Sequence, residues 1–406
     1  MTKLAEEFVA RGNEVTIVTS VPHYDNNQIW PEYSNKLMYH EQRDGMNIYR
    51  LRTYIPKDKS SIAQRLLGYG TFHVLSLLRA ATLPAHDVIL VPSPPLSNGV
   101  VADLISRIRG TPFVYNVQDI WPDVAVRAGV LTNTRALRVL QRMERYVYSR
   151  SSKIAVISEG FRRQLLQKGV PPDRLSVISN FIDTDFIEPV PKPNEFTKRY
   201  GLDGKFIVLF AGNMGFSQGL DVVLDSAQLL REQTDIEFLL VGNGASKIQT
   251  EERCHSLHLK NVRFLPYQPH ESVPAMYGAA DVCLIPLKRG FTTESVPCKL
   301  FSIMAAGKPS VAAVDRGSDT ANLIALANCG VCIEPEDPSA LAQAICDYRD
   351  NPDHAVAAGQ RGRRFVESNF QPSGIANSYL RILESALPVE TSLGHKEAVP
   401  SSSDIG

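Results

Sequence analysis

Long apolar runs and a cysteine framework are both missing from this sequence of 406 residues. No apolar run approaches the roughly 20 residues of a membrane-spanning helix, so no such helix is predicted. All six cysteines lie in the second half without even spacing. Cys329 and Cys332 form a CxxC, but the absence of a second such pair argues against a metal or redox centre. The nine histidines form no cluster with ligand spacing. Because no signal peptide is apparent, we expect a reducing, cytoplasmic location.

Net charge is also absent, but the two halves of the chain differ. Residues 1–185 hold 23 Lys and Arg against 17 Asp and Glu, and the remainder holds 20 against 26. A basic first half suits an anionic partner such as a membrane surface or a phosphate-bearing acceptor, although chance variation in surface charge explains it equally well. Nothing indicates nucleic-acid binding. Length and an apolar content of 44% fit a globular protein with two sizeable domains.

The first half alternates predicted strands and helices. Strand-like runs fall at 15–19, 46–51, 87–91, 112–117, 153–157 and 175–178, and helical patterns cover 60–83, 96–109, 135–150 and 159–168. This alternation predicts parallel βαβ units. An amphipathic helix carrying Leu4 and Phe8 stands before the first strand, where an α/β domain normally has a strand. We therefore expect either a true start upstream or a domain that lacks a central strand.

The second half repeats the pattern after a proline-rich segment, EPVPKPN, at 188–194. Predicted strands lie at 206–211, 236–241, 262–265, 281–286, 309–314 and 330–333, and predicted helices at 220–233, 270–280, 298–307 and 339–349. Helical patterns continue from 355 to 387, followed by a polar tail. The sequence thus predicts an α/β protein of two successive doubly wound domains, with ligands bound between them at the carboxyl ends of the strands.

Three loops with anion-binding character are expected at that edge. The first, FAGNMGFSQGLD at 210–221, places Gly212, Gly215 and Gly219 between a strand and a helix. The second is VGNGAS, which contains Gly242 and Gly244. The third, at 288–297, precedes a helix starting near Cys298, whose first N–H groups lack internal partners. Structural glycines explain one such loop, but three together favour a nucleotide diphosphate.

Longer motifs resemble one family over nearly the whole chain, up to about residue 385. The segments IVLFAGNMGFSQGLDVVLDSA, FLLVGNGASK, NVRFLPYQPHESVPAMYGAADVCLIPL, ESVPCKLFSIMAAGKPSVAA and FVYNVQDIWPDVAVRAGVL are similar to GT-B glycosyltransferases of family 4, in the branch that builds colanic-acid-type exopolysaccharides. The resemblance implies two Rossmann-like domains facing across a cleft, at 1–187 and 201–365. It also implies a linker at 188–200, a C-terminal helix at 366–387 that packs back on the first domain, and a disordered tail at 388–406.

The resemblance also implies roles for individual residues. Glu294 matches the first glutamate of the family's E-x7-E motif, which lies against the donor sugar, and Ser302 stands where the second glutamate normally binds the ribose. Asp119 follows Gln118 where many relatives have His-Asp, and it is expected to position acceptor or donor; helix capping is the alternative role. The expected donor-binding residues are Asn213, Gly215, Phe216, Gln218, Gly242, Tyr267, Cys298, Lys299, Leu300 and Ser302.

Asn213 and Gln218 replace the Arg and Lys that many relatives place on the diphosphate. Backbone amides at 215–216 and 298–300, together with Lys299, would then carry most of the phosphate charge. The implied activity is retaining sugar transfer from a UDP- or GDP-sugar to a saccharide acceptor, with no metal or other cofactor. Asp183-Thr184-Asp185 spells a metal-binding DxD, but it lies in a stretch that the resemblance assigns to interdomain structure. Two alternatives remain open: a GT-B-type nucleotide-sugar epimerase and a non-catalytic nucleotide-sugar-binding protein.

The segment 60–83 carries a row of apolar residues with Arg65 and Arg79 near its ends. A core helix is one interpretation of this pattern. The other is a helix that lies on the inner face of the plasma membrane and helps to collect a polyprenyl-linked acceptor. Gly68 and Gly70 weaken the segment as a regular helix.

Overall fold

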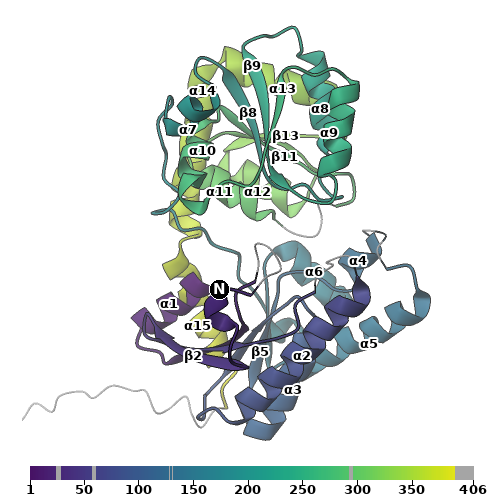
Figure 1. The fold of residues 1–406 in the computed structure, drawn as a ribbon, viewed down its shortest axis with the longest axis vertical. Coiled ribbons are helices and arrows are strands. Elements are labelled where there is room, and N and C mark those ends of the chain that lie inside the picture. Colours follow the sequence, from purple (N-terminus) through teal and green to yellow (C-terminus); the bar gives the residue numbers. More distant parts are fainter. Residues whose placement is uncertain (24–28, 57–60, 128, 130, 292–295, 389–406) are drawn as a thin grey trace, which may run out of the picture.

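A computed structural model describes residues 1–23, 29–56, 61–127, 129, 131–291 and 296–388. Two α/β domains follow one another along the chain, and Figure 1 shows them stacked along the long axis. The prediction of an α/β protein with two Rossmann-like domains is confirmed. The predicted disordered tail lies almost wholly outside the described residues. No helix within the described ranges is both long enough and apolar enough to cross a bilayer.

The N-terminal domain contains two small sheets. In one, β1 pairs in parallel with β3, and β2 pairs antiparallel with β3; the other is the parallel sheet β4-β5-β6-β7. The described chain begins with α1, so no described strand precedes it, and β1 and β4 belong to separate sheets. The elements are α1 (Thr2–Ala10), β1 (Val15–Ser20), η1 (Pro31–Tyr33), β2 (Met38–Arg43), β3 (Met46–Leu51), α2 (Ile62–Ala81), β4 (Ile89–Pro92), α3 (Ser97–Arg109), β5 (Phe113–Val117), α4 (Asp123–Arg127), α5 (Thr134–Arg150), β6 (Lys153–Val156), α6 (Glu159–Gln167), η2 (Pro172–Arg174) and β7 (Leu175–Val177).

Side-chain alternation along β5 explains the layers of this domain. Phe113, Tyr115 and Val117 pack with residues of α3, α5 and α6 on one face of the sheet. Val114 faces the other way, where α1 and the C-terminal helix α15 (Pro372–Glu384) cover the sheet with residues such as Leu4 and Tyr379. The prediction that the last helix returns to the first domain is therefore confirmed.

The C-terminal domain has one six-stranded parallel sheet with the order β10-β9-β8-β11-β12-β13. The order reverses between β8 and β11, so the loops that follow these two strands border the crevice in which doubly wound domains bind ligands. The elements are α7 (Glu195–Tyr200), β8 (Phe206–Asn213), α8 (Leu220–Leu229), β9 (Ile236–Asn243), α9 (Lys247–Ser256), β10 (Val262–Leu265), η3 (His270–Ser272), α10 (Val273–Ala279), β11 (Val282–Pro286), α11 (Cys298–Ala305), β12 (Ser310–Ala313), α12 (Asp319–Ala327), β13 (Gly330–Ile333), α13 (Pro338–Asp350) and α14 (Pro352–Asn369).

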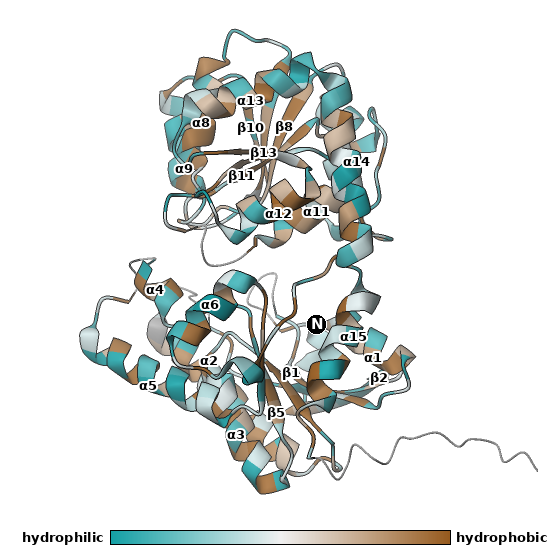
Figure 2. Cartoon of the chain, turned by 180° about the vertical axis from the view of Figure 1, so that it is seen from behind, coloured by the Kyte–Doolittle hydropathy of each residue, from teal (hydrophilic) through white to brown (hydrophobic). Residues whose placement is uncertain are grey.

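Both faces of this sheet are covered. Ile207 and Leu209 of β8 pack with α10, α11 and α12, while Val208 and Phe210 pack with α8 and α13. In Figure 2 the strands are coloured hydrophobic, whereas the surrounding helices mix both colours. Continuous apolar strands are what burial on both faces requires.

Several elements differ from the sequence predictions. The antiparallel strand β2 was not predicted, because its side chains are largely exposed and show no apolar alternation. The helices α4, α7 and α12 were also missed, and α7 occupies the end of the predicted linker at 188–200. The continuous helical pattern at 355–387 divides into α14 and α15, because Pro372 starts a new helix.

Candidate functional site

Three loops of the C-terminal domain are joined by hydrogen bonds at the β8–β11 crevice. The register pairs Gly212 with Gly242, and beyond the strand ends the Met214 N–H donates to the Asn243 carbonyl (2.8 Å). On the other side the Gly219 N–H donates to the Pro286 carbonyl (2.7 Å). The glycine loop after β8 is therefore held between the loops that follow β9 and β11.

Close backbone contact makes glycine necessary at Gly242. Its φ is +145°, and an added Cβ would lie 1.9 Å from the Gly212 carbonyl oxygen. A side chain there would separate β8 from β9 at the edge where ligands bind. Gly242 was predicted as a donor-binding residue. In the structure it allows β9 to pack closely against β8 beside the β8 loop.

The third loop leads into α11, whose first turn lies against the β8 loop. The Lys299 Nζ donates a hydrogen bond to the Gln218 Oε1 (2.8 Å) and lies 3.9 Å from the centre of the Phe210 ring. A Cβ built on Gly212 would be 3.5 Å from the Lys299 Cε. The predicted residues Gln218 and Lys299 are thus neighbours, although 81 positions separate them in the chain.

Desolvation dominates the electrostatics of the corner where the β8 loop meets the first turn of α11. It lowers the pKa of Lys299 to about 7, because the ammonium group has lost most of its water. Among the described residues no carboxylate forms an ion pair with Lys299, and the hydrogen-bond partner of its Nζ is the neutral Gln218 side chain. In the β8 loop, the N–H groups of Gly215 and Phe216 donate no hydrogen bond to any described residue. The Phe216 side chain is 58% exposed.

The remaining predicted donor-binding residues lie around this corner. Asn213 ends β8, and the Tyr267 hydroxyl donates to the Asn243 carbonyl (3.2 Å), which brings the loop after β10 to the same edge. Cys298 and Leu300 belong to the first turn of α11, but the Leu300 N–H already donates to the Pro297 carbonyl (2.9 Å). Ser302 lies further along α11 and is hydrogen-bonded to the buried Tyr277 hydroxyl.

Asp119 comes from the facing domain, directly after β5. Burial raises the pKa of its carboxyl group. Desolvation raises the pKa of the Cys298 thiol, and the negative charge of Asp119 adds to that increase, which places the carboxylate near the start of α11. Asn180 also reaches this position, since its Nδ2 lies 3.7 Å from the Cys298 Sγ. Glu294, the other predicted catalytic residue, lies outside the described residues.

A second contact between the domains was not predicted. The Asp319 carboxylate in the first turn of α12 accepts the Gly160 N–H of α6 (2.8 Å) and contacts Arg163 (3.4 Å). The sequence signal for this contact was the start of a helix after Ser318, where no helix was predicted.

The DxD sequence at 183–185 has a local structural role. The Asp183 carboxylate accepts the N–H groups of Asp185 (3.1 Å) and Phe186 (3.2 Å), and it pairs with Lys3. Within the described ranges, no group of three or more His, Cys, Asp or Glu side chains is placed to hold a metal ion.

Comparison with known proteins agrees with the fold and identifies the family. The family model for group 1 glycosyl transferases matches residues 193–365, and the model for the glycosyl transferase 4-like domain matches residues 1–180. A putative colanic acid biosynthesis glycosyl transferase, WcaI of Escherichia coli K12, is 28% identical over 90% of this chain and 91% of its own.

Solved structures with low sequence identity share the fold. Sucrose-phosphate synthase from Thermosynechococcus elongatus superposes with a TM-score of 0.70 at 18% identity, over 94% of this chain and 91% of its own. Anabaena HepE in complex with UDP-glucose gives a TM-score of 0.69 at 15% identity, over 92% of this chain and 100% of its own.

Proposed function

Because this chain belongs to the GT-B glycosyltransferases of family 4, we propose that it moves a sugar, with retention of configuration, from a nucleotide-diphosphate sugar to a saccharide acceptor. The convergence of the β8 loop, the β9 loop and the first turn of α11 around Lys299 carries this proposal. The likeness to a colanic acid transferase favours an acceptor in cell-surface polysaccharide synthesis, and we propose a polyprenyl-linked one. A UDP- or GDP-sugar is the proposed donor, since HepE was solved with UDP-glucose.

In this proposal the diphosphate lies between the β8 loop and α11. The N–H groups of Gly215 and Phe216, the positive end of the α11 dipole and the Lys299 ammonium stabilise the charge that develops on the leaving group. The bond from the anomeric carbon to the diphosphate breaks, and the acceptor hydroxyl attacks from the same face. Its proton passes to a phosphate oxygen of the departing nucleoside diphosphate. No metal ion takes part in the proposed reaction.

Two carboxylates complete the proposed site. Glu294 orients the hydroxyl groups of the donor sugar, as its match to the family motif implies. Asp119 positions the acceptor or the donor from the facing domain, and its place near the start of α11 supports that role.

Nucleotide-sugar turnover tests this function. The protein is incubated with UDP- and GDP-sugars, with and without a polyprenyl-linked oligosaccharide acceptor. Nucleoside diphosphate released only with acceptor supports transfer. An isomerised donor would instead support an epimerase, and binding without turnover would support a non-catalytic binding protein.

A matched pair of variants tests the role of Glu294. Glu294→Gln should lower kcat by about 100-fold or more, the scale on which transition-state contacts contribute. Glu232→Gln alters an exposed carboxylate that pairs with Arg231 just before β9, at the opposite end of the strands from the site, and it should leave turnover unchanged. Transfer by Glu294→Gln at the wild-type rate would refute the assigned role.

A further inference from the structure

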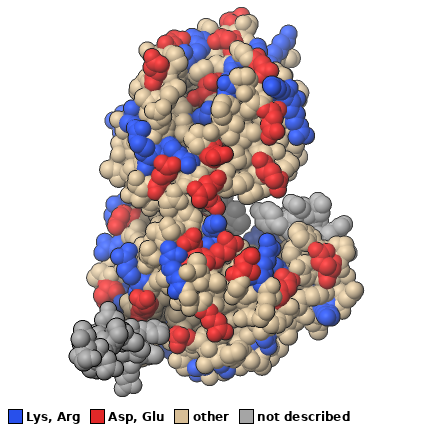
Figure 3. Space-filling view, turned by 90° about the vertical axis from the view of Figure 1, so that its left-hand side faces the viewer, with Lys and Arg blue, Asp and Glu red and all other residues tan. Residues whose placement is uncertain are grey.

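Three helices on one side of the N-terminal domain expose no carboxylate. The helices α2, α3 and α5 lie side by side, with α3 packed against both of the others (Figures 1 and 2). They contain two acidic residues, Asp103 and Glu144, whose exposed fractions are 2% and 3%. By contrast, acidic and basic side chains are interspersed on the face shown in Figure 3.

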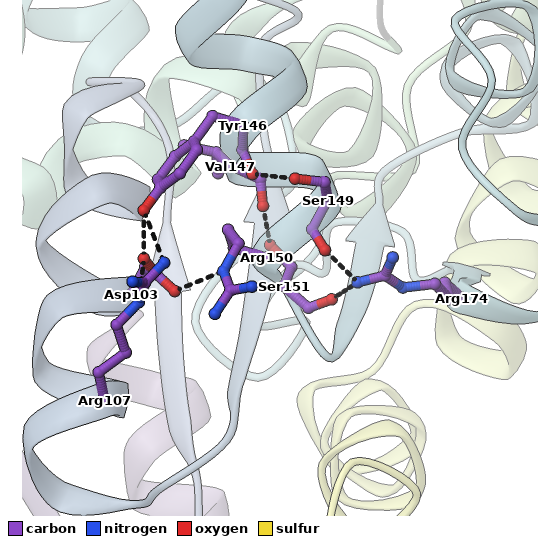
Figure 4. A network of polar contacts seen from close by, with 8 residues as sticks. All are labelled: Asp103, Arg107, Tyr146, Val147, Ser149, Arg150, Ser151 and Arg174. Carbon is purple, nitrogen blue, oxygen red and sulfur yellow. Dashed lines mark hydrogen bonds and ion pairs between the residues drawn. The ribbon is translucent and has the colours of Figure 1, made fainter.

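Both buried carboxylates are occupied by partners inside the domain. Figure 4 shows Asp103 accepting hydrogen bonds from Tyr146 and Arg150 and pairing with Arg107. Glu144 accepts two hydrogen bonds from the Lys168 Nζ (2.7 and 2.9 Å). The Asp103 contacts fix α3 to α5, and the Glu144 contact fixes α5 to the end of α6. Neither carboxylate adds negative charge to the outer side of the three helices.

An arginine stripe runs along α5. Arg135, Arg138, Arg142 and Arg145 follow a spacing of three, four and three residues, which places them on one face of the helix. All four side chains are exposed, and none forms an ion pair with a described residue. Uncompensated charges in such a row favour an extended anionic partner.

An apolar stripe accompanies the arginines on the neighbouring helices. On α2, Leu66, Leu67, Val74 and Leu78 are 63%, 51%, 59% and 62% exposed, and their spacing also places them on one face. On α3, Ile108 is 61% exposed. Outward faces of helices in a globular domain are normally polar, so this one has the composition of a contact surface.

We propose that α2, α3 and α5 form a docking surface for an anionic lipid bilayer. The arginine stripe would contact lipid phosphates, while the leucines of α2 enter the boundary between headgroups and acyl chains. A nucleic acid would use the arginines but has no place for the leucines. This inference rests on the proposed function, because a lipid-linked acceptor requires the enzyme to work at a bilayer.

Vesicle co-sedimentation of the full chain tests the surface without any nucleotide sugar. Wild-type protein should bind vesicles of phosphatidylglycerol and phosphatidylethanolamine, and bind neutral phosphatidylcholine vesicles at least about tenfold more weakly. Arg135→Gln, Arg138→Gln, Arg142→Gln and Arg145→Gln combined should weaken binding to the anionic vesicles by about fivefold per residue, or more than about 100-fold altogether. Lysine at the same four positions is the matched control and should retain most of the binding.

A second variant separates insertion from charge attraction. Leu66→Gln with Leu78→Gln should remove the binding that persists at high salt, because only apolar insertion resists ionic screening. Circular dichroism and thermal melting establish that each variant is folded. Equal binding of wild type to both vesicle types, unchanged binding of the arginine variant, or binding of RNA in place of vesicles would each overturn the inference. Donor turnover in detergent solution is measured separately, so failure of the docking surface is distinguishable from failure of the proposed function.

Discussion

Protonation of Lys299 should couple donor binding to pH. In the free protein the pKa of this lysine is about 7, so roughly half of the molecules lack its positive charge at neutral pH. A bound diphosphate returns the pKa toward the ordinary lysine value of about 10.4, because the anion compensates the ammonium charge. Binding above pH 7 therefore requires proton uptake.

Linkage gives the size of this effect. If the complex keeps Lys299 charged, the Kd for a nucleotide-sugar rises about 25-fold between about pH 6.5 and pH 8.5. The ligand does not obscure this slope, since both phosphoryl groups of a sugar diphosphate are already ionised in that range. Lys299→Met should bind about 10- to 100-fold more weakly at the lower pH, because it lacks a charge-assisted hydrogen bond. Its Kd should no longer change with pH, as isothermal titration calorimetry would measure.

Lys308 provides the matched control. Burial also lowers its pKa, but its Nζ donates to the Gly278 carbonyl (2.9 Å) and it precedes β12, at the opposite end of the strands from the site. Lys308→Met should keep the wild-type pH slope. If Lys299→Met keeps that slope as well, another group takes up the proton and the reasoning is refuted.

Three further changes test the structure in different ways. Burial raises the pKa of Asp119, so the fold loses stability as pH rises from the ordinary pKa of an aspartate through the raised one. Asp119→Asn should therefore raise the melting temperature near pH 8, lose this advantage near pH 4, and lower turnover. Burial alone would raise the pKa of Asp103, but hydrogen bonds from Tyr146 and two arginines hold that pKa below its ordinary value. The carboxylate therefore stabilises the fold above the ordinary pKa of an aspartate, and this stabilisation is lost as pH falls through the lowered pKa. Asp103→Asn should cost about 2 kcal/mol in urea unfolding at pH 7, and the difference should shrink at acid pH. Gly242→Ala should lower the free energy of unfolding by about 3 kcal/mol or more, because the new Cβ would meet the neighbouring strand. Gly169 also has a positive φ (+84°) but no atom near its Cβ position, so Gly169→Ala should lower the free energy of unfolding by about 1 kcal/mol.

Periodicity predicted the elements that carry a buried apolar face. The strand predicted at 46–51 has the same bounds as β3, and the helix predicted to start near Cys298 starts there in α11. Periodicity failed for β2, which is held by pairing with β3 and not by an apolar face. The turn between them was a readable signal, because Asp44 and Gly45 both have positive φ and Asp-Gly is the typical hairpin sequence.

Glycine patterns predicted the loops of the site, but not the contacts between them. Fold topology implies that loops after neighbouring parallel strands meet at one edge of the sheet. It does not reveal that Lys299 would lie over Phe210, or that Asn243 would accept hydrogen bonds from two other loops. Such contacts depend on side-chain packing between segments far apart in the chain. The contact between Asp319 and Gly160 was missed for the same reason.

The departures from the family pattern have a common electrostatic consequence. The resemblance places Arg or Lys at positions 213 and 218 and a glutamate at 302, where this chain has Asn213, Gln218 and Ser302. Two positive charges and one negative charge are thus replaced by neutral groups, and Ser302 is hydrogen-bonded to buried Tyr277. Of the residues at these three positions and Lys299, only the lysine carries an ionisable group. Desolvation lowers its pKa to about 7. In the proposed diphosphate site, the positive side-chain charge therefore comes from Lys299, so donor affinity should depend on the proton that Lys299 acquires.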